Sequence, residues 1–402
     1  MKTLYVHVGT PKTGTSAIQD FLDKNKPLLK QKGWLFRRMK IKDFHRNMVT
    51  VDGEGRLCFK LYSGTMGTVG KSRNGFFLHG DRGESAEVSL ADLTKGLEVL
   101  KEWFTQADRV ILTDEGIWTD FESWDYGRRL REFADHNGIQ IKIIVYLRPQ
   151  ADYVDSFYRS RVKWKYQSED WETFLQEDEL LNYFGVNYEK RLQAFSDVFG
   201  KENLLVRPYE PALWKAEGRT LFSDFAEALG ISDISDCVLP EALVNESLSF
   251  NQTEIKRQIN GMAEENDSSL SDYTRMTRNA SLLCSGLKED EERYSYFGEE
   301  ERNRFMQQFH EGNCRVAKEY LGREELFLQP PRPSRKWKKD PAAMEEDVIL
   351  YFGAMTRCLY EEISRLKQEN EELARHSIGN RLRRFFAKLK NRQHRKQNGV
   401  TR

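Results

Sequence analysis

Short apolar runs separated by amphipathic helical segments dominate the first half of the chain. The run I-K-I-I-V-Y-L at residues 141–147 is apolar and β-branched, which is typical of a strand buried in a parallel sheet. Further strands are predicted at about 3–8, 109–113 and 203–207, with helices at about 15–31 and 150–165. This alternation predicts an α/β fold in which a parallel sheet is flanked by helices.

The C-terminal part has a different periodicity. After a basic, proline-rich segment at 329–341, apolar residues recur three and four positions apart. In heptad notation the a positions hold Ile349, Thr356, Ile363 and Asn370, and the d positions hold Phe352, Leu359, Leu366 and Leu373. Leucine at d with one asparagine at a favours a parallel two-stranded coiled coil, and therefore a homodimer through residues 349–373. The alternative is a helix that packs on its own chain.

The tail at residues 377–402 holds nine lysines and arginines and no acid, whereas the whole chain has 63 basic and 63 acidic residues. Its apolar side chains share one helical face: Ile378, Leu382, Phe385, Phe386 and Leu389. A basic amphipathic helix of this kind binds anionic membrane surfaces, and a solvated, disordered tail is the alternative. Nucleic acid is not expected as a partner, because no stacking module or recognition fold accompanies the charge.

These patterns divide the chain into four parts: an α/β domain at 1–330, a linker at 331–345, an amphipathic helix at 346–376 and the basic tail at 377–402. Five scattered cysteines, an odd number, indicate reduced thiols. No signal peptide and no apolar stretch of about 20 residues is found. We therefore expect a cytoplasmic protein that the tail would bring to the inner leaflet of a membrane. No Cys/His cluster has metal-ligand spacing, so no metal is expected.

The first predicted strand continues into V-H-V-G-T-P-K-T-G-T-S at residues 6–16. In the P-loop of triphosphate-binding proteins, G-x-x-x-x-G-K-S/T, the lysine after the second glycine reaches the β- and γ-phosphates. Gly9 and Gly14 keep this spacing, but Thr15 replaces that lysine and the lysine of this loop is Lys12. Backbone N–H groups and a helix N-terminus still point at an anion. The loop suits a nucleotide whose 5′ end carries something other than a triphosphate.

A second candidate site follows the run at 141–147. Pro149 biases Arg148 toward an extended conformation and suits the first turn of a helix. Arg148 is therefore expected at the carboxyl end of the strand, with Ser156 on the next helix. A guanidinium fork and a hydroxyl donor are suited to binding a phosphate. Capping of a helix, or a pair with a surface acid, is the structural alternative for Arg148.

With these residues the sequence resembles the bacterial-type sulfotransferases that use 3′-phosphoadenosine-5′-phosphosulfate (PAPS). Their 5′-phosphosulfate loop, P-K-S/T-G-T-S/T, is matched by Pro11, Lys12, Thr13, Gly14, Thr15 and Ser16. Their 3′-phosphate site, an arginine that ends a strand and a serine eight residues later, is matched by Arg148 and Ser156, with Tyr158 following. The resemblance covers roughly residues 1–330 and is specific only at these motifs. It implies a P-loop-type fold, PAPS as the sulfate donor and 3′,5′-ADP as the product.

Two residues compete for the role of catalytic base that this resemblance implies. Glu115 follows the predicted strand at 109–113, and in open parallel sheets ligands bind outside the carboxyl ends of the strands. His45 falls where some relatives place a base, and the near-neutral pKa of histidine suits proton abstraction. Lys12 would neutralise charge on the oxygen between phosphate and sulfate. The expected acceptor is a carbohydrate hydroxyl of a polysaccharide or a lipid-linked or surface glycan.

The run V-I-L-T-D-E at 110–115 also supports a rival function. An apolar strand that ends in Asp-Glu is typical of a Walker B motif, so the alternative is a P-loop ATPase or nucleotide kinase with Asp114 and Glu115 in that motif. Thr15 and the Arg148–Ser156 pair count against it. A non-catalytic scaffold built on a decayed nucleotide site is a third class, disfavoured because both motifs are intact.

Overall fold

The structure is a computed structural model. It describes residues 1–36, 71–72, 75–79, 85–88, 90–113, 116–119, 125–164, 167–176, 185–240, 248–262, 270–284, 294–331, 334–376 and 379.

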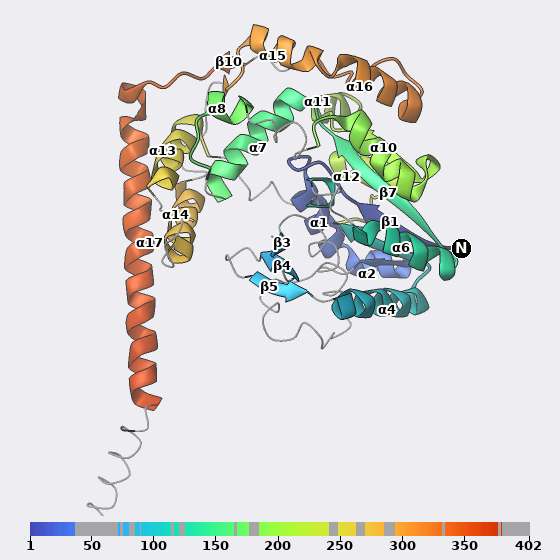
Figure 1. Ribbon diagram of the computed structural model, residues 1–402, viewed down its shortest axis with the longest axis horizontal. Coiled ribbons are helices and arrows are strands. Elements are labelled where there is room, and N and C mark those ends of the chain that lie inside the picture. The colour runs from blue at the N-terminus through green and yellow to red at the C-terminus, as the bar shows by residue number, and fades with distance from the viewer. Residues whose placement is uncertain are drawn as a thin grey trace, which may run out of the picture.

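Five parallel strands form the central sheet in the order β2-β6-β1-β7-β8. Their bounds are Trp34–Phe36 (β2), Arg109–Thr113 (β6), Lys2–His7 (β1), Ile139–Leu147 (β7) and Leu204–Pro208 (β8). In the middle of the sheet, His7 of β1 stands opposite Thr113 of β6 and Ile144 of β7. The prediction of an α/β fold with a parallel sheet flanked by helices is confirmed (Figure 1).

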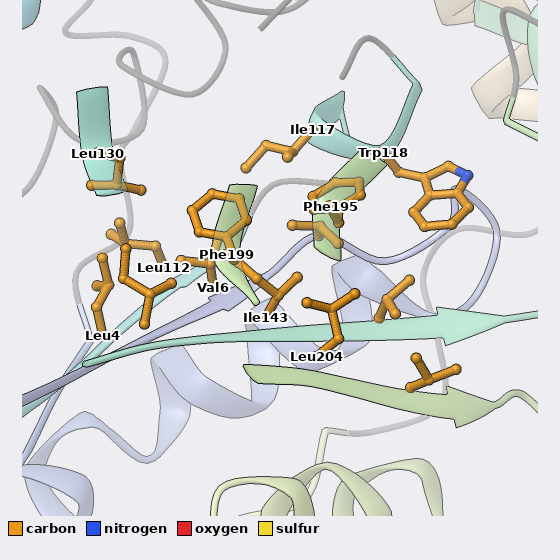
Figure 2. Packing of buried hydrophobic residues seen from close by; sticks show 14 of the residues in the cluster. Leu4, Val6, Leu112, Ile117, Trp118, Leu130, Ile143, Phe195, Phe199 and Leu204 are labelled. Atoms are coloured by element: carbon orange, nitrogen blue, oxygen red, sulfur yellow. The ribbon is translucent and has the colours of Figure 1, made fainter. Parts of the chain in front are cut away.

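Helices cover both faces of this sheet because its strands are apolar on both sides. One face packs against α4 (Leu90–Gln106), α6 (Asp125–His136) and α10 (Tyr188–Phe199). The other packs against α1 (Thr15–Lys24), α2 (Lys26–Gln31), α11 (Pro211–Ala216) and α12 (Leu221–Ala228). Figure 2 shows the first layer, in which strand residues meet α10: Leu4, Val6, Leu112, Ile143, Leu204, Phe195 and Phe199.

The segment at 15–31, expected as one helix, is two helices that meet at Asn25. Pro27 lies in the first turn of α2, where it has no N–H to continue the hydrogen bonds of α1. The Asn25 side-chain amide donates instead to the carbonyls of Phe21 and Val238, at 2.8 Å each. The helix expected at 150–165 is α7 (Gln150–Trp164), directly after Arg148 and Pro149.

The remaining elements lie outside these two layers. They are the helices α5 (Gly116–Thr119), α8 (Trp171–Gln176), α13 (Phe250–Gly261), α14 (Leu270–Cys284), α15 (Glu299–Gln307) and α16 (His310–Val316), the 3₁₀ helix at Lys201–Asn203 and the π-helical turn at Ala317–Leu321. The strands β3 (Lys71–Ser72), β4 (Gly75–His79) and β5 (Ser85–Val88) form a small antiparallel sheet. A parallel pair joins β9 (Tyr294–Ser295) to β10 (Arg335–Lys336).

The last described helix, α17 (Pro341–His376), packs on α13 and α14 and then continues beyond them (Figure 1). The segment expected as a linker at 331–345 contains β10 and the first turn of α17. Of the expected tail at 377–402, only Gly379 is among the described residues. No helix in the described part of the chain is long and apolar enough to cross a membrane.

Candidate functional site

The loop between β1 and α1 is attached to the neighbouring strand β7. The Val8 N–H donates to the carbonyl of Ile144 at 2.9 Å, and both the N–H and the hydroxyl of Thr10 donate to the carbonyl of Tyr146 at 3.0 Å. The Thr13 hydroxyl closes the loop by donating to the Thr10 carbonyl at 2.6 Å. These bonds hold the loop at the carboxyl edge of the sheet, where ligands bind in open parallel sheets.

Three residues of the loop have a left-handed backbone: Gly9 with φ 35°, Lys12 with φ 69° and Gly14 with φ 85°. Lys12 is the only such residue other than glycine in the described ranges, and this conformation costs a residue with a Cβ about 1–2 kcal/mol. At Gly14 a Cβ would also collide with the Leu221 side chain of α12. The loop is therefore a strained arrangement that its surroundings impose, which is typical of functional sites.

The loop ends at the start of α1, where several hydrogen-bond donors have no acceptor within the helix. Gly14 caps α1 without a side-chain hydrogen bond, and the first N–H groups of a helix have no intrahelical acceptor. The buried Thr15 hydroxyl has no hydrogen-bond partner within the described structure. Because buried polar groups are nearly always hydrogen-bonded, this set of donors fits a phosphate-like anion.

His7, the last residue of β1, lies beneath the loop. Its Nδ1 bonds to the Thr113 hydroxyl at 2.9 Å, whereas its buried Nε2 has no partner among the described residues. Complete burial lowers the pKa of His7 to about 3, so the ring is neutral at pH 7. A Cβ on Gly9 would lie 3.0 Å from the Thr15 Oγ1 and 3.2 Å from the His7 Nε2. Gly9 therefore separates two unsatisfied polar atoms that face each other across the loop.

Arg148 contacts the loop from the end of β7. Its Nη1 donates to the carbonyl of Lys12 at 3.1 Å, and its own carbonyl accepts a hydrogen bond from the hydroxyl of Tyr188. Burial lowers the pKa of Arg148, and the Asp152 carboxylate acts in the opposite direction. An arginine guanidinium stays charged in proteins. The two sequence motifs are thus brought into direct contact, although they lie 136 residues apart.

Arg148 also lines a cleft of about 850 Å³ at the carboxyl ends of β7 and β8. Its walls combine charged and aromatic side chains, among them Tyr209, Phe250, Arg302, His310 and Phe327. The helices α15 and α16 contribute one wall, and the segment after residue 324 contributes another. A volume of this size accommodates a ligand as large as a nucleoside or a sugar unit.

Several charges in the cleft are already paired. Asp152 accepts a hydrogen bond from Arg302 at 2.6 Å, and Asp155 accepts one from Arg159 at 3.1 Å and one from the Ser295 hydroxyl at 2.7 Å. The Arg159 guanidinium lies 4.7 Å from the centre of the Phe250 ring. These contacts fix the walls of the cleft.

Ser156 is buried on α7, with 7% of its surface exposed, and it is not among the described residues that line the cleft. Tyr158, two residues on, belongs to an aromatic cluster with Trp171, Phe174 and Tyr296, and its hydroxyl donates to the carbonyl of Glu169 at 3.0 Å. Tyr158 is therefore a packing residue. The structure brings Arg148 to the loop, and it places Ser156 on the helix that follows, buried and outside the lining of the cleft.

The remaining predicted residues divide into two groups. Pro11, Thr13 and Thr15 are buried in the loop, Lys12 is half-buried and Ser16 is exposed. Asp114, Glu115 and His45 lie outside the described residues, so the choice of a base stays a prediction. Thr113, the neighbour of Asp114 at the end of β6, is held by His7. Within the described ranges no group of three or more His, Cys, Asp and Glu side chains is arranged to hold a metal ion.

The sequence analysis missed two parts of the site. His7 stands inside the loop motif itself, but the alternation of V-H-V does not reveal that its ring is fully buried. Tyr209 and Glu210 directly follow β8 and line the cleft. Their signal was available, since they closely follow the strand predicted at 203–207, and the structure pairs this strand with β7.

Comparisons with known proteins give few matches. No family model matches the sequence. An uncharacterized protein of Archaeoglobus fulgidus is 30% identical over 187 residues, which make up 46% of this chain and 48% of that protein. The chain thus spans about half the length of this relative. A sulfotransferase from Alicyclobacillus acidocaldarius, known from its crystal structure, is similar over 70% of this chain and 94% of that chain, with 14% identity and a TM-score of 0.32. A likeness at this level carries no argument about function.

Proposed function

We propose that the chain is a sulfotransferase that moves the sulfuryl group of PAPS to a hydroxyl of a carbohydrate acceptor. One observation carries the proposal: the Arg148 guanidinium bonds to the Lys12 carbonyl of an anion-binding loop that has no lysine after its second glycine. A cation placed beside this loop, at the mouth of a cleft, suits a nucleotide with phosphate groups at both the 3′ and the 5′ position.

The residues of the chain have distinct roles in this proposal. The Thr15 hydroxyl and the first N–H groups of α1 bind the 5′-phosphate. Lys12 belongs to the loop and has a left-handed backbone. Its ammonium group neutralises the charge that builds on the oxygen between phosphate and sulfate as the bond from this oxygen to sulfur breaks. Arg148 binds the 3′-phosphate, with Ser156 as the second donor that the sequence resemblance implies. PAPS supplies an activated sulfuryl group when bound, and Glu115 or His45 removes the proton of the acceptor hydroxyl.

Ligand-induced thermal stabilisation tests the nucleotide. The protein should be stabilised by 3′,5′-ADP, since a ligand at 100 times its Kd adds about 2.7 kcal/mol to the free energy of unfolding. Neither 5′-AMP nor ATP with Mg²⁺ should match this effect, because the first lacks the 3′-phosphate and the second needs the missing lysine. A preference for ATP with Mg²⁺ would instead favour an ATPase or kinase.

Matched variants assign the two phosphates. Arg148→Met should weaken 3′,5′-ADP binding about 10- to 100-fold, the value of a hydrogen bond to a charged group, and weaken 5′-AMP binding less, through the lost bond to the Lys12 carbonyl alone. Arg129→Met, at an exposed arginine of α6, is the control. Lys12→Ala should abolish sulfuryl transfer to a glycan panel and keep weak 3′,5′-ADP binding, with the exposed Lys30→Ala as its control. Unchanged turnover of Lys12→Ala contradicts the proposal.

A further inference from the structure

Two apolar faces run along α17, and only one of them is covered. Met344, Tyr351, Ala354 and Cys358 are buried against α13 and α14. The Tyr351 hydroxyl bonds to the Ser281 hydroxyl at 2.7 Å and donates to the Thr277 carbonyl at 3.1 Å. These residues occupy the c and f positions of the heptad. Val348 and Met355, at g positions, are partly buried in the same contact. The helix thus packs on its own chain with its c, f and g side and leaves the a and d positions outside this contact.

The a and d positions form the second face, called here the seam. It consists of the exposed apolar residues Ile349, Phe352, Leu359, Ile363, Leu366 and Leu373. Their exposed fractions run from 42% at Ile363 to 69% at Leu373. A continuous row of large apolar side chains in water is unusual for a monomer and marks a contact surface. Figure 1 shows α17 at the edge of the molecule, with α13 and α14 on one side of it.

We propose that the seam joins two copies of this chain into a parallel homodimer. In a parallel coiled coil a g residue faces the e residue five positions later on the partner. Glu362 at g would face Lys367 of the second copy, which is a complementary pair, whereas Met355 at the preceding g position stays packed against α13 and α14 of its own chain. In the antiparallel arrangement g residues face each other, so the acidic side chains of Glu362 and Glu369 would meet. The charge pattern therefore selects the parallel orientation.

The polar residues of the seam agree with this orientation. Asn370, at an a position, would face the same asparagine of the second copy only when the helices are parallel and in register, where the two amides hydrogen-bond to each other. The Thr356 hydroxyl, at another a position, already donates to the Phe352 carbonyl of its own helix at 2.8 Å. The Thr356 hydroxyl can therefore be buried in the seam with its hydrogen bond already made.

Sedimentation equilibrium of the full chain tests the contact. The wild type should be a dimer at micromolar concentration, and Leu359→Glu with Leu366→Glu should be a monomer, with the dissociation constant raised at least 100-fold. The matched control, Arg357→Gln with Gln368→Glu, changes the net charge equally at the exposed b and f positions and should stay dimeric. A monomeric wild type, or a dimer that survives the seam substitutions, overturns the proposal.

A charge swap and a cross-link test the orientation. Glu362→Lys should weaken dimerisation several-fold, and adding Lys367→Glu should restore it.

Leu373→Cys should form an intermolecular disulfide on oxidation, whereas Gln368→Cys on the outer side should not. Absence of the Leu373→Cys cross-link in a dimeric sample rules out the parallel register. The monomeric variant should still be stabilised by 3′,5′-ADP, so failure of the dimer and failure of the proposed activity are separate outcomes.

Discussion

Lys12 combines a left-handed backbone with a cationic side chain, and the interactions that hold it come from residues far away in sequence. Arg148 binds its carbonyl from the end of β7, and Leu221 of α12 leaves no space for a side chain at Gly14. The spacing of glycines and lysine is visible in the sequence, so the loop could be predicted. The buried ring of His7 could not, because its burial results from Thr113 and Phe225, which other segments bring to it.

His7 should make the stability of the protein depend on pH. Its pKa is about 3 in the folded chain and about 6.5 in the unfolded chain, so between these values the unfolded state binds more protons. The free energy of unfolding should therefore fall as the pH drops below 6.5, by up to about 1.4 kcal/mol per pH unit from this group. Urea unfolding between pH 7.5 and 4.5 measures this slope.

The variant His7→Asn should have a smaller slope over the same range, because it cannot titrate. The exposed His136→Asn of α6 should keep the slope of the wild type. Equal slopes for His7→Asn and wild type would show that the His7 ring is not held neutral by burial.

At the scale of elements, one carboxylate ties α12 to the sheet. Asp224 of α12 is 4% exposed and accepts hydrogen bonds from Arg207 of β8 at 2.7 and 2.8 Å and from the Tyr146 hydroxyl of β7 at 2.8 Å. Arg219 adds a third partner at 3.0 Å. Because α12 also carries Leu221, this network fixes the helix that closes over Gly14.

Removal of this carboxylate should be strongly destabilising. Asp224→Ala leaves the half-buried Arg207 without its main partner, which typically costs about 3–5 kcal/mol. Glu227→Ala, at an exposed acid that also contacts Arg219, should change the free energy of unfolding by less than about 1 kcal/mol. Denaturant unfolding of both variants compares the two, and similar losses would contradict the role given to burial.

Element boundaries could be predicted where a single residue fixes them locally. Pro149 directly precedes α7, which begins at Gln150 as predicted. The predicted strand at 141–147 is observed at Ile139–Leu147. Pro27 indicates the break at Asn25. The regular spacing of the apolar residues on both sides of it nevertheless favoured a single helix. The cleft walls α15 and α16 had no such signal, since their position depends on contacts with α7 and α10, which lie far away in the sequence.

At the scale of the whole molecule, a buried amide pair joins the C-terminal wall of the cleft to the sheet domain. Gln150 of α7 and Asn313 of α16 exchange two hydrogen bonds, at 2.7 and 3.1 Å. Near them, Glu210 accepts the N–H groups of Leu328 and Gln329. Helix α16 and the segment at 328–329 are thereby held against the ends of β7 and β8.

A double-mutant cycle should show this coupling. Asn313→Ala removes the donor to the buried Gln150 Oε1, and Gln150 Nε2 keeps its long bond to the Val186 carbonyl at 3.4 Å, so the change should cost about 1–3 kcal/mol, whereas the further change Gln150→Ala should add little. The exposed Gln308→Ala is the control, within about 0.5 kcal/mol of wild type. Strict additivity of the two single changes, measured by urea unfolding, would mean that the amides do not act as a pair.

The central place of β1 has a consequence for how the protein is made. β1 lies between β6 and β7 in the sheet and precedes both in the sequence, so one of its edges stays open until β6 has been synthesised and the other until residue 147. The loop after it depends on the carbonyls of Ile144 and Tyr146 in the same way. Nascent chains that end before β7 therefore present an apolar strand with at least one free edge, which makes it a target for chaperones until the sheet is complete.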